Sequence, residues 1–195
     1  MTSFFALLVF VIFMVGTPGP ANLLLMVSGL NFGMRRSLSF IGGLVTGKLV
    51  LNIMVGFGLG VFLSDSPQIK TLFSVFSACY IIYLGIRSWP SPSPVCSKTS
   101  ETRRLHFFDG LFVHPLSPKT WVMLVLAWNE FASALGDFWM QLLTMILTFS
   151  VCQILFHGFW CWLGVKFEKN LSDSAYITKF VICLTVAVVL FALLY

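Results

Sequence analysis

The stretch Thr17-Pro18-Gly19-Pro20 interrupts an apolar run from Phe4 to Leu30 that contains no charged side chain. A run of this length can cross a bilayer as a helix. The two prolines have no amide N–H, so the carbonyls of Met14 and Gly16 lose their helical donors, and the glycine allows the backbone to bend further. In lipid, such a break is tolerated only where it is buried in protein or faces a water-filled cavity. The stretch therefore predicts a transmembrane helix that is broken near mid-depth at a functional site.

A second break of the same kind lies one hundred residues further along the chain. The stretch His114-Pro115-Leu116-Ser117-Pro118-Lys119 falls inside the apolar segment 107–131, and Ser117-Pro118 repeats the pattern of Thr17-Pro18. Ser or Thr before proline is typical of an N-cap followed by the first residue of a new helix. Proline kinks without any ligand are common in membrane helices. Paired interruptions at corresponding points of two halves, however, indicate a transport site built from discontinuous helices.

The composition is that of an integral membrane protein. Of the 195 residues, 58% are hydrophobic and 10% are charged, and the mean hydropathy is +0.94, which leaves too little polar surface to cover a soluble globule. The first apolar run has no Lys or Arg before it and continues past Pro20, so we expect it to stay in the protein instead of acting as a signal peptide. The net charge of +5 comes from basic residues scattered over loops, which argues against a nucleic-acid partner.

Six apolar segments and a polar linker predict the domain organisation. The segments cover residues 4–30, 38–63, 71–89, 107–131, 138–165 and 180–195, and a basic turn over 31–37 joins the first two. The alternating prolines of Pro90-Ser91-Pro92-Ser93-Pro94 favour an extended chain. We therefore expect a first three-helix repeat over 1–89, a Pro/Ser-rich basic linker over 90–106 and a second three-helix repeat over 107–195.

The basic residues also predict the orientation. Loops on one side hold nine Lys or Arg and loops on the other hold only Lys70; the nine are Arg35, Arg36, Arg87, Lys98, Arg103, Arg104, Lys166, Lys169 and Lys179. By the positive-inside rule the nine-residue side is cytoplasmic, which places both termini in the periplasm and Cys96 of the linker in the cytoplasm. The expected fold is an all-α integral membrane protein of six transmembrane helices. They form two inverted three-helix repeats, with the first and fourth helices broken at proline.

Four polar side chains lie within the expected spans. Lys48 and Asn52 are four residues apart and share a helical face, as do Gln153 and His157. An ionisable group inside the membrane marks a cavity or a pathway. Two structural alternatives stay open, because Lys48 is near enough to the start of its span to reach the interface by snorkelling, and a lone His is often a packing group.

Small residues and cysteines have structural interpretations. Gly43 and Gly47 have the GxxxG spacing that lets another helix approach closely. The cysteines are Cys79, Cys96, Cys152, Cys161 and Cys183; they form no C-x-x-C pair, so the sequence predicts neither a disulfide framework nor a metal site. Those in apolar segments are expected to be small buried apolar residues.

Three motifs occur in order along nearly the whole chain. They are Gly16-Thr17-Pro18-Gly19-Pro20 followed by Asn22, the run Tyr80-Ile81-Ile82-Tyr83-Leu84-Gly85-Ile86-Arg87, and Leu116-Ser117-Pro118-Lys119. Together they resemble the LysE/RhtB family of amino-acid exporters, and Phe159-Trp160-Cys161-Trp162 is most similar to the cysteine/O-acetylserine exporter branch. The resemblance implies outward transport of small zwitterionic amino acids or close derivatives across a bacterial inner membrane, with the proton motive force as driver.

The chain departs from the family pattern at three points. Ser117 stands where the family usually has Asn before Pro-Lys, and Asn129-Glu130-Phe131 stands in place of Pro-Gln-Phe. Lys48 stands where many relatives have an acidic or neutral residue. These departures bear on the expected substrate more than on the expected fold.

We expect the substrate site at the two breaks, since the start of a half-helix carries partial positive charge that suits a carboxylate. The expected substrate-binding residues are Thr17, Pro18, Gly19, Pro20, Asn22, Lys48, Asn52, Ser117, Pro118, Lys119, Gln153 and His157. Lys119 either binds substrate or pairs with the carbonyls of Met14 and Gly16, and the sequence does not decide between these roles. All seven Asp and Glu residues fall in loops or at span ends, so His157, Lys48 and Lys119 are the candidate proton carriers.

Other functions share this architecture. A membrane thiol or electron-transfer protein needs two cysteines that can meet, and none lies near Pro18 or Pro118. A small-ion or metal exporter would need His and carboxylate clusters within the membrane. A purely structural membrane subunit is a further alternative. The sequence favours a transporter, not an enzyme, with an amino acid and the lipid bilayer as partners and no cofactor, and it leaves open whether copies of the chain form a homo-oligomer.

Overall fold

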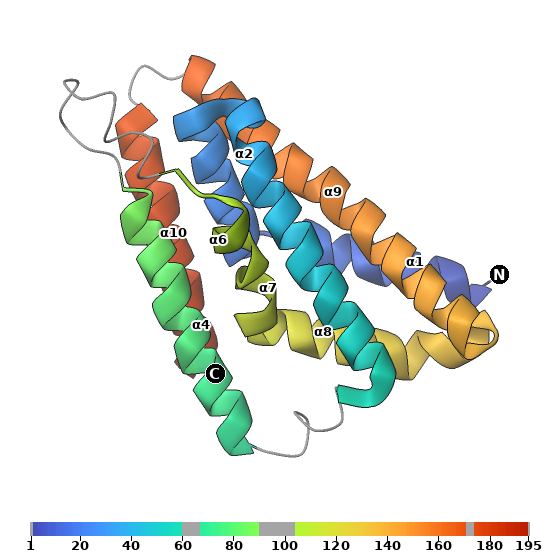
Figure 1. Cartoon of the computed structure of the whole chain (residues 1–195). Helices are drawn as coiled ribbons and strands as arrows, with labels where there is room; N and C mark the ends of the chain where they lie inside the picture. The colour runs from blue at the N-terminus through green and yellow to red at the C-terminus, as the bar shows by residue number, and fades with distance from the viewer. Residues whose placement is uncertain (1, 60–66, 90–103, 171–173, 195) are drawn as a thin grey trace.

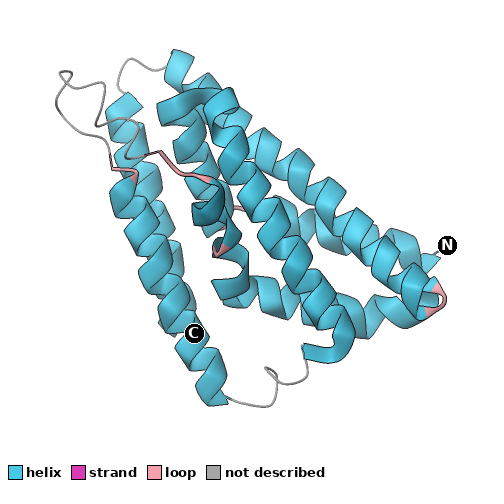
Figure 2. Cartoon of the chain, in the orientation of Figure 1, coloured by secondary structure: helices cyan, strands magenta, loops and turns pink. Residues whose placement is uncertain are grey.

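The computed structural model describes residues 2–59, 67–89, 104–170 and 174–194, and these parts are helical, with no strand (Figures 1 and 2). The helices are α1 (Thr2–Gly16), α2 (Pro20–Met54), the π-helical turn η1 (Val55–Leu59), α4 (Pro67–Arg87), α6 (Phe107–Leu111), α7 (Val113–Leu116), α8 (Pro118–Phe131), the 3-10 turn η2 (Ala132–Leu135), α9 (Phe138–Asn170) and α10 (Ser174–Leu194). The expected all-α fold is confirmed. Most of the expected linker, including Cys96, lies outside the described residues.

Helix α2 has two arms that meet at Gly33. Gly33 has φ 76°, a left-handed conformation that favours glycine, and the chain reverses direction there (Figure 1). We call residues 20–32 the first arm and residues 34–54 the second arm. Ser37 donates to the Gly33 carbonyl at 2.9 Å, and the hydroxyls of Ser28 and Ser37 join the two arms at 2.8 Å. The connection expected over 31–37 is therefore much tighter than a seven-residue basic turn, because helical residues continue on both sides of Gly33.

The long helix α9 packs against α1 and α2, while α6 and α7 pack against α2 and α10 packs against α2 and α4. The expected close approach at Gly43 and Gly47 is confirmed. A Cβ atom at Gly43 would overlap the carbonyl of Phe107, and one at Gly47 would overlap the carbonyl of Leu111. These two glycines thus let the backbone of α6 lie directly on the second arm.

Gly43→Ala is expected to destabilise the protein by about 1–3 kcal/mol, because the added methyl group meets backbone atoms that have little room to move. Gly42→Ala is the matched control, since its Cβ would meet only the Phe107 ring at an ordinary 3.7 Å. Thermal unfolding in detergent should show a lower Tm for Gly43→Ala and an unchanged or higher Tm for Gly42→Ala. Equal Tm values for the two variants would contradict this packing.

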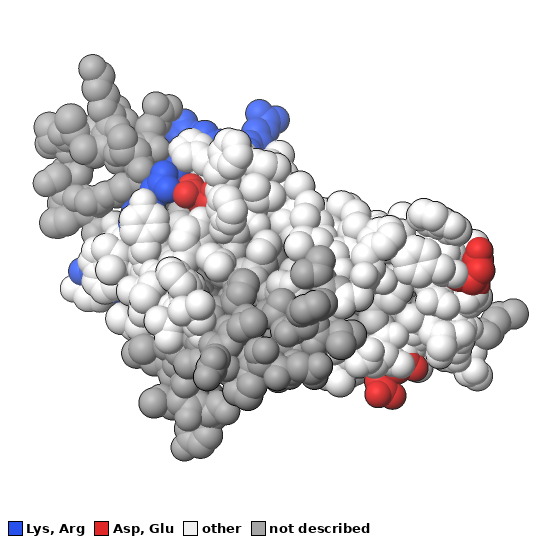
Figure 3. Space-filling model, turned by 60° about the horizontal axis from the view of Figure 1, so that its bottom comes forward, with Lys and Arg blue, Asp and Glu red and all other residues white. Residues whose placement is uncertain are grey.

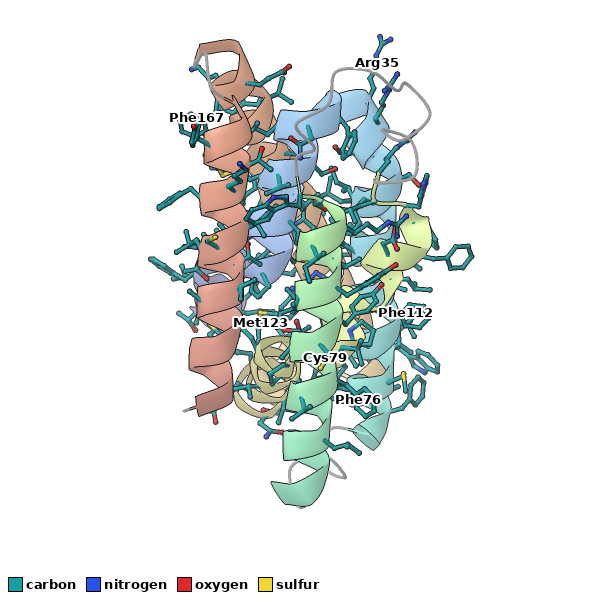
Figure 4. All side chains as sticks on the ribbon, turned by 90° about the vertical axis from the view of Figure 1, so that its left-hand side faces the viewer. Arg35, Phe76, Cys79, Phe112, Met123 and Phe167 are labelled. Atoms are coloured by element: carbon teal, nitrogen blue, oxygen red, sulfur yellow. The ribbon has the colours of Figure 1, made fainter. Side chains whose placement is uncertain are left out.

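The bundle exposes many large apolar side chains and buries a set of polar ones within its apolar core. On α9 the exposed side chains include Leu143, Leu147, Val151 and Leu155, and Phe112 and Phe167 point outward in Figure 4. The buried polar residues include Asn22, Ser28, Ser37, Lys48, Asn52, His114, Thr120, Gln153 and His157. Soluble proteins show the reverse distribution. The exterior is therefore suited to lipid, and the interior holds the polar chemistry.

Two helical stretches of the described chain are long and apolar enough to cross a membrane, Pro20–Gly58 and Phe138–Glu168. Shorter apolar helices cover Thr2–Gly16, Ala78–Arg87 and Thr178–Ala187. The first long stretch includes the reversal at Gly33, so each of its arms is shorter than the whole.

Apart from the cavity-lining Lys48 and Lys119, the charged side chains of the described chain lie toward the ends of the bundle. On the face shown in Figure 3, basic side chains gather at one end with one acidic group beside them, and the other visible acidic side chains lie toward the opposite end. Arg35 marks the basic end in Figure 4. At this end Arg87 pairs with Asp109 at 2.7 Å, and Arg104 donates to the Arg36 carbonyl at 3.0 Å. These contacts tie the ends of α4, α6 and α2 together.

Candidate functional site

The two proline stretches meet inside the bundle. Helix α1 ends at Gly16, and α2 begins at Pro20 with Gly19 as N-cap. Helix α8 begins at Pro118 with the extended residue Ser117 as N-cap. The side chain of Lys119, in the first turn of α8, donates to the Thr17 hydroxyl at 2.8 Å although 102 residues separate them. The starts of α2 and α8 therefore lie beside each other.

The carbonyls that the prolines leave without helical donors find other partners. The Thr17 hydroxyl donates to the carbonyl of Met14 at 3.2 Å, and the indole of Trp160 on α9 donates to the carbonyl of Gly16 at 3.2 Å. Lys119 bonds the Thr17 hydroxyl and neither of these carbonyls. Of the two roles left open for Lys119, pairing with Met14 and Gly16 is therefore not the one seen.

Asn22 fastens the break from the α2 side. Its amide nitrogen donates to the carbonyls of Val15 and Thr17, each at 2.9 Å. Its amide oxygen lies 2.9 Å from Nδ1 of His157. Because the nitrogen is used by two carbonyls, the oxygen must accept, and His157 therefore carries its proton on Nδ1.

A chain of buried side chains continues from His157. Gln153 Nε2 lies 3.0 Å from His157 Nε2 and donates to the carbonyl of Leu44 at 3.0 Å. The ring of His114 stacks on that of His157 with centroids 5.6 Å apart, and their Nε2 atoms are 3.4 Å apart. Thr120 in turn lies 3.1 Å from His114 Nδ1. This network links α2, α7, α8 and α9 around one point.

A cavity of about 40 Å³ opens beside this network, enough for about three water molecules. The expected site residues that line it are Thr17, Gly19, Pro20, Asn22, Lys48, Ser117, Lys119 and His157. Thr17 and Lys119 are exposed, whereas Lys48 and His157 are buried. The cavity therefore runs inward from an open mouth at Thr17 to an enclosed floor.

Four expected site residues lie outside the lining. Pro18 is exposed in the break, and Pro118 is the first residue of α8. Gln153 stands behind His157 and reaches the cavity only through it. Asn52 accepts from the indole of Trp128 at 2.8 Å, one turn further along the second arm than Lys48.

Lys48 is 2% exposed and faces the cavity. Its ammonium lies 5.0 Å from the centroid of the Phe149 ring, a cation–π arrangement. Within the described residues it has no ion pair and no hydrogen-bond acceptor. The structure thus places Lys48 as a cavity-lining cation, and it does not snorkel.

Sequence reasoning missed His114, Thr120 and Trp160. His114 could have been found, because it is an ionisable residue in an apolar segment directly before the second break, the same signal that singled out His157. Thr120 and Trp160 are ordinary membrane-helix residues, and only their contacts mark them.

The cysteines and acids of the described chain lie apart from the cavity. The free cysteines of the described chain are Cys79, Cys152, Cys161 and Cys183, and none lines it. Among the residues that the structure describes, no three His, Cys, Asp or Glu side chains are grouped so that they could hold a metal ion. The chemistry offered here is binding by ammonium groups, amides and hydroxyls.

Comparisons with known proteins place this chain among membrane translocators. A membrane protein of Vibrio cholerae is 29% identical over 146 residues, which cover 73% of this chain and 71% of that protein. The homoserine/homoserine lactone efflux protein of Salmonella typhimurium is 30% identical over 118 residues, 59% of this chain and 57% of that protein, so the match spans less than two thirds of its length. The membrane protein YrhP of Bacillus subtilis is 24% identical over 175 residues, covering 84% of this chain and 83% of that protein.

No solved structure matches the chain significantly. The family model of the LysE type translocator matches residues 12–195, which include both helix breaks and the whole cavity lining. The chain therefore belongs to the LysE type translocator family.

Proposed function

We propose that this protein is a secondary transporter that exports a small amino acid or a close derivative through the cavity between the two helix breaks. The observation that carries the proposal is that two half-helices, α2 and α8, start beside each other. Lys119 at the start of α8 donates to the hydroxyl of Thr17, which precedes α2. Helix N-termini suit a carboxylate, and broken helices in a membrane protein are typical of transport sites. Membership of a translocator family and the efflux activity named for the Salmonella relative support export.

The proposed topology is six spans in two inverted repeats. The first repeat, within 1–89, comprises α1 with the first arm, the second arm, and α4; the second, within 107–195, comprises α6 to α8, α9 and α10. The first arm runs from the centre to the basic end, whereas α8 runs from the centre to the opposite end (Figure 1). This opposite course of the two half-helices supports the inversion.

We propose a bacterial inner-membrane location with the basic end in the cytoplasm and both chain termini in the periplasm. Arg35→Cys, at the basic end, should resist a membrane-impermeant maleimide in intact cells and react after permeabilisation, because basic loops stay inside. Ser133→Cys, exposed in η2 at the other end, is the matched control and should react in intact cells. Both variants use a background with the native cysteines replaced by alanine. If Arg35→Cys is labelled in intact cells and Ser133→Cys is not, the orientation is the reverse of the one proposed.

We propose coupling to the proton motive force. The ionisable groups that line the cavity are Lys48, His114, Lys119 and His157. For coupling, one of these groups would be protonated in one of the inward- and outward-facing states and deprotonated in the other. In this conformation the cavity holds about three water molecules. Alternating access would open it to each side of the membrane in turn.

Counterflow in proteoliposomes tests the proposed function. Vesicles loaded with an unlabelled amino acid should accumulate the same labelled amino acid transiently, and protein-free vesicles should not. A panel that includes homoserine covers the activity named for the relative. If no amino acid or derivative shows counterflow with correctly inserted protein, the proposal is wrong.

A further inference from the structure

Two ammonium groups in the cavity lack an anionic partner among the residues that the structure describes. Lys48 is 2% exposed, and its ammonium has only the Phe149 ring, 5.0 Å from the ring centroid, as a partner within the described chain. Lys119 donates to the neutral hydroxyl of Thr17 at 2.8 Å. Both side chains line the same cavity. A buried ammonium without a counter-charge is unfavourable, so this site favours the uptake of an anion.

No carboxylate of the described chain lines the cavity. Asp109 is paired with Arg87 at 2.7 Å at the basic end, and Glu130, Asp137 and Glu168 are exposed. The described residues therefore supply no negative charge here to balance the two lysines.

Free backbone donors add to the positive character. The amides of Ala21 and Asn22 lie in the first turn of α2, and the amide of Lys119 lies in the first turn of α8. Such amides have no acceptor within their own helix. Neither N-cap makes a side-chain hydrogen bond that would satisfy them. Both helix starts thus add partial positive charge to the lysine pair.

The groups that could hold a substrate ammonium are already occupied. The break exposes the carbonyls of residues 14–17, and internal donors use all four: Thr17 bonds Met14, Asn22 bonds Val15 and Thr17, and Trp160 bonds Gly16. The Asn22 amide oxygen accepts from His157 Nδ1. His157 Nε2, left with its lone pair, accepts from Gln153. A zwitterion would therefore find several partners for its carboxylate, whereas each of these acceptors for its ammonium already has an internal donor.

We propose that the cavity selects small carboxylate solutes with a net negative charge, such as an acidic amino acid or an amino acid whose amino group is acylated. This rests on the transport function proposed above and names its substrate class. Charge complementarity favours such a solute over a zwitterion of the same shape, because its net negative charge offsets the two lysines, and acylation of the amino group also removes the ammonium that would stand beside them.

Counterflow with matched solute pairs tests the inference. Aspartate and asparagine have the same shape and differ in charge, and N-acetylalanine differs from alanine because acetylation converts the ammonium group into a neutral amide. The wild-type protein should exchange the anion of each pair about tenfold faster or more, since tenfold corresponds to about 1.4 kcal/mol of discrimination. Equal or faster exchange of asparagine and alanine would overturn the inference and leave the transport function standing. Homoserine exchange without exchange of either anion would also overturn it, whereas no exchange of any solute would contradict transport itself.

Variants of Lys48 give a second test. Lys48→Met keeps the length of the side chain without its charge, so the anion-to-neutral rate ratio should fall to near one, whereas Lys48→Arg should preserve it. Lys166→Met is the matched control, because Lys166 is exposed and its ammonium lies over the Trp162 ring at 5.0 Å. Size-exclusion profiles verify folding, and Lys48→Gln replaces Lys48→Met if that variant aggregates. An unchanged rate ratio in the folded neutral variant would refute the assignment.

Discussion

Replacing Pro18 and Pro20 together with alanine is expected to abolish transport, by about 100-fold or more, while insertion into the membrane survives. Each alanine restores an amide N–H that can bond the carbonyl of Met14 or Gly16, so α1 can continue toward α2. Those carbonyls are now held by Thr17 and Trp160. A continuous helix would displace Thr17 and withdraw the start of α2 from the cavity, and a shift of about 1 Å at a binding site can lower rates about 100-fold.

Counterflow at matched protein levels measures this effect. Pro67→Ala, at the first residue of α4 and outside the cavity lining, is the control and should transport at close to the wild-type rate. Normal transport by a correctly inserted Pro18→Ala/Pro20→Ala variant would mean that the break has no role in the site.

Lys119→Met is expected to lower transport about 10- to 100-fold, with its largest effect on substrate affinity. The Lys119 ammonium lies at the cavity mouth, where its contact in the described chain is the Thr17 hydroxyl at 2.8 Å. A charge-assisted hydrogen bond to a carboxylate contributes about 1.5–3 kcal/mol, which corresponds to this range of affinity. Methionine keeps the packing of the side chain and removes the charge.

Comparing efflux with exchange separates the roles of Lys119. Loss of substrate binding lowers both rates, whereas loss of a proton carrier lowers net efflux and spares exchange. Lys166→Met again serves as the exposed control. If Lys119→Met exports at the wild-type rate under an imposed pH gradient, Lys119 is a structural residue that only positions Thr17.

Local chemistry explains what the sequence predicted. Proline cannot donate to the preceding turn, so α1 ends at Gly16 and α2 and α8 begin at Pro20 and Pro118 whatever surrounds them. The GxxxG spacing likewise has one steric consequence, close approach, and α6 supplies the partner backbone at Gly43 and Gly47. Features set by backbone sterics were accessible without a structure.

Features that depend on which distant side chains meet were not accessible. The expectation that Asn52 joins Lys48 in the cavity used helical periodicity alone. Asn52 lies one turn further along the second arm, and there its side chain contacts Trp128 of α8 instead of the cavity. The stacking of His114 on His157 joins residues that are 43 positions apart. Trp160 reaches the Gly16 carbonyl across 144 positions. Such contacts follow from how helices dock, which neither local spacing nor composition determines.

Solute protection of a cysteine placed at the break tests the central claim most directly. Ser117→Cys changes one atom of a half-buried cavity-lining residue at the start of α8, in a background whose native cysteines are replaced by alanine. The rate of modification by methyl methanethiosulfonate is followed by intact-protein mass spectrometry with and without a solute that shows counterflow. We expect a saturating solute to slow modification about tenfold or more, at concentrations that match its counterflow affinity. A modification rate that stays constant at every solute concentration would contradict the claim that the transported solute binds where the two half-helices meet.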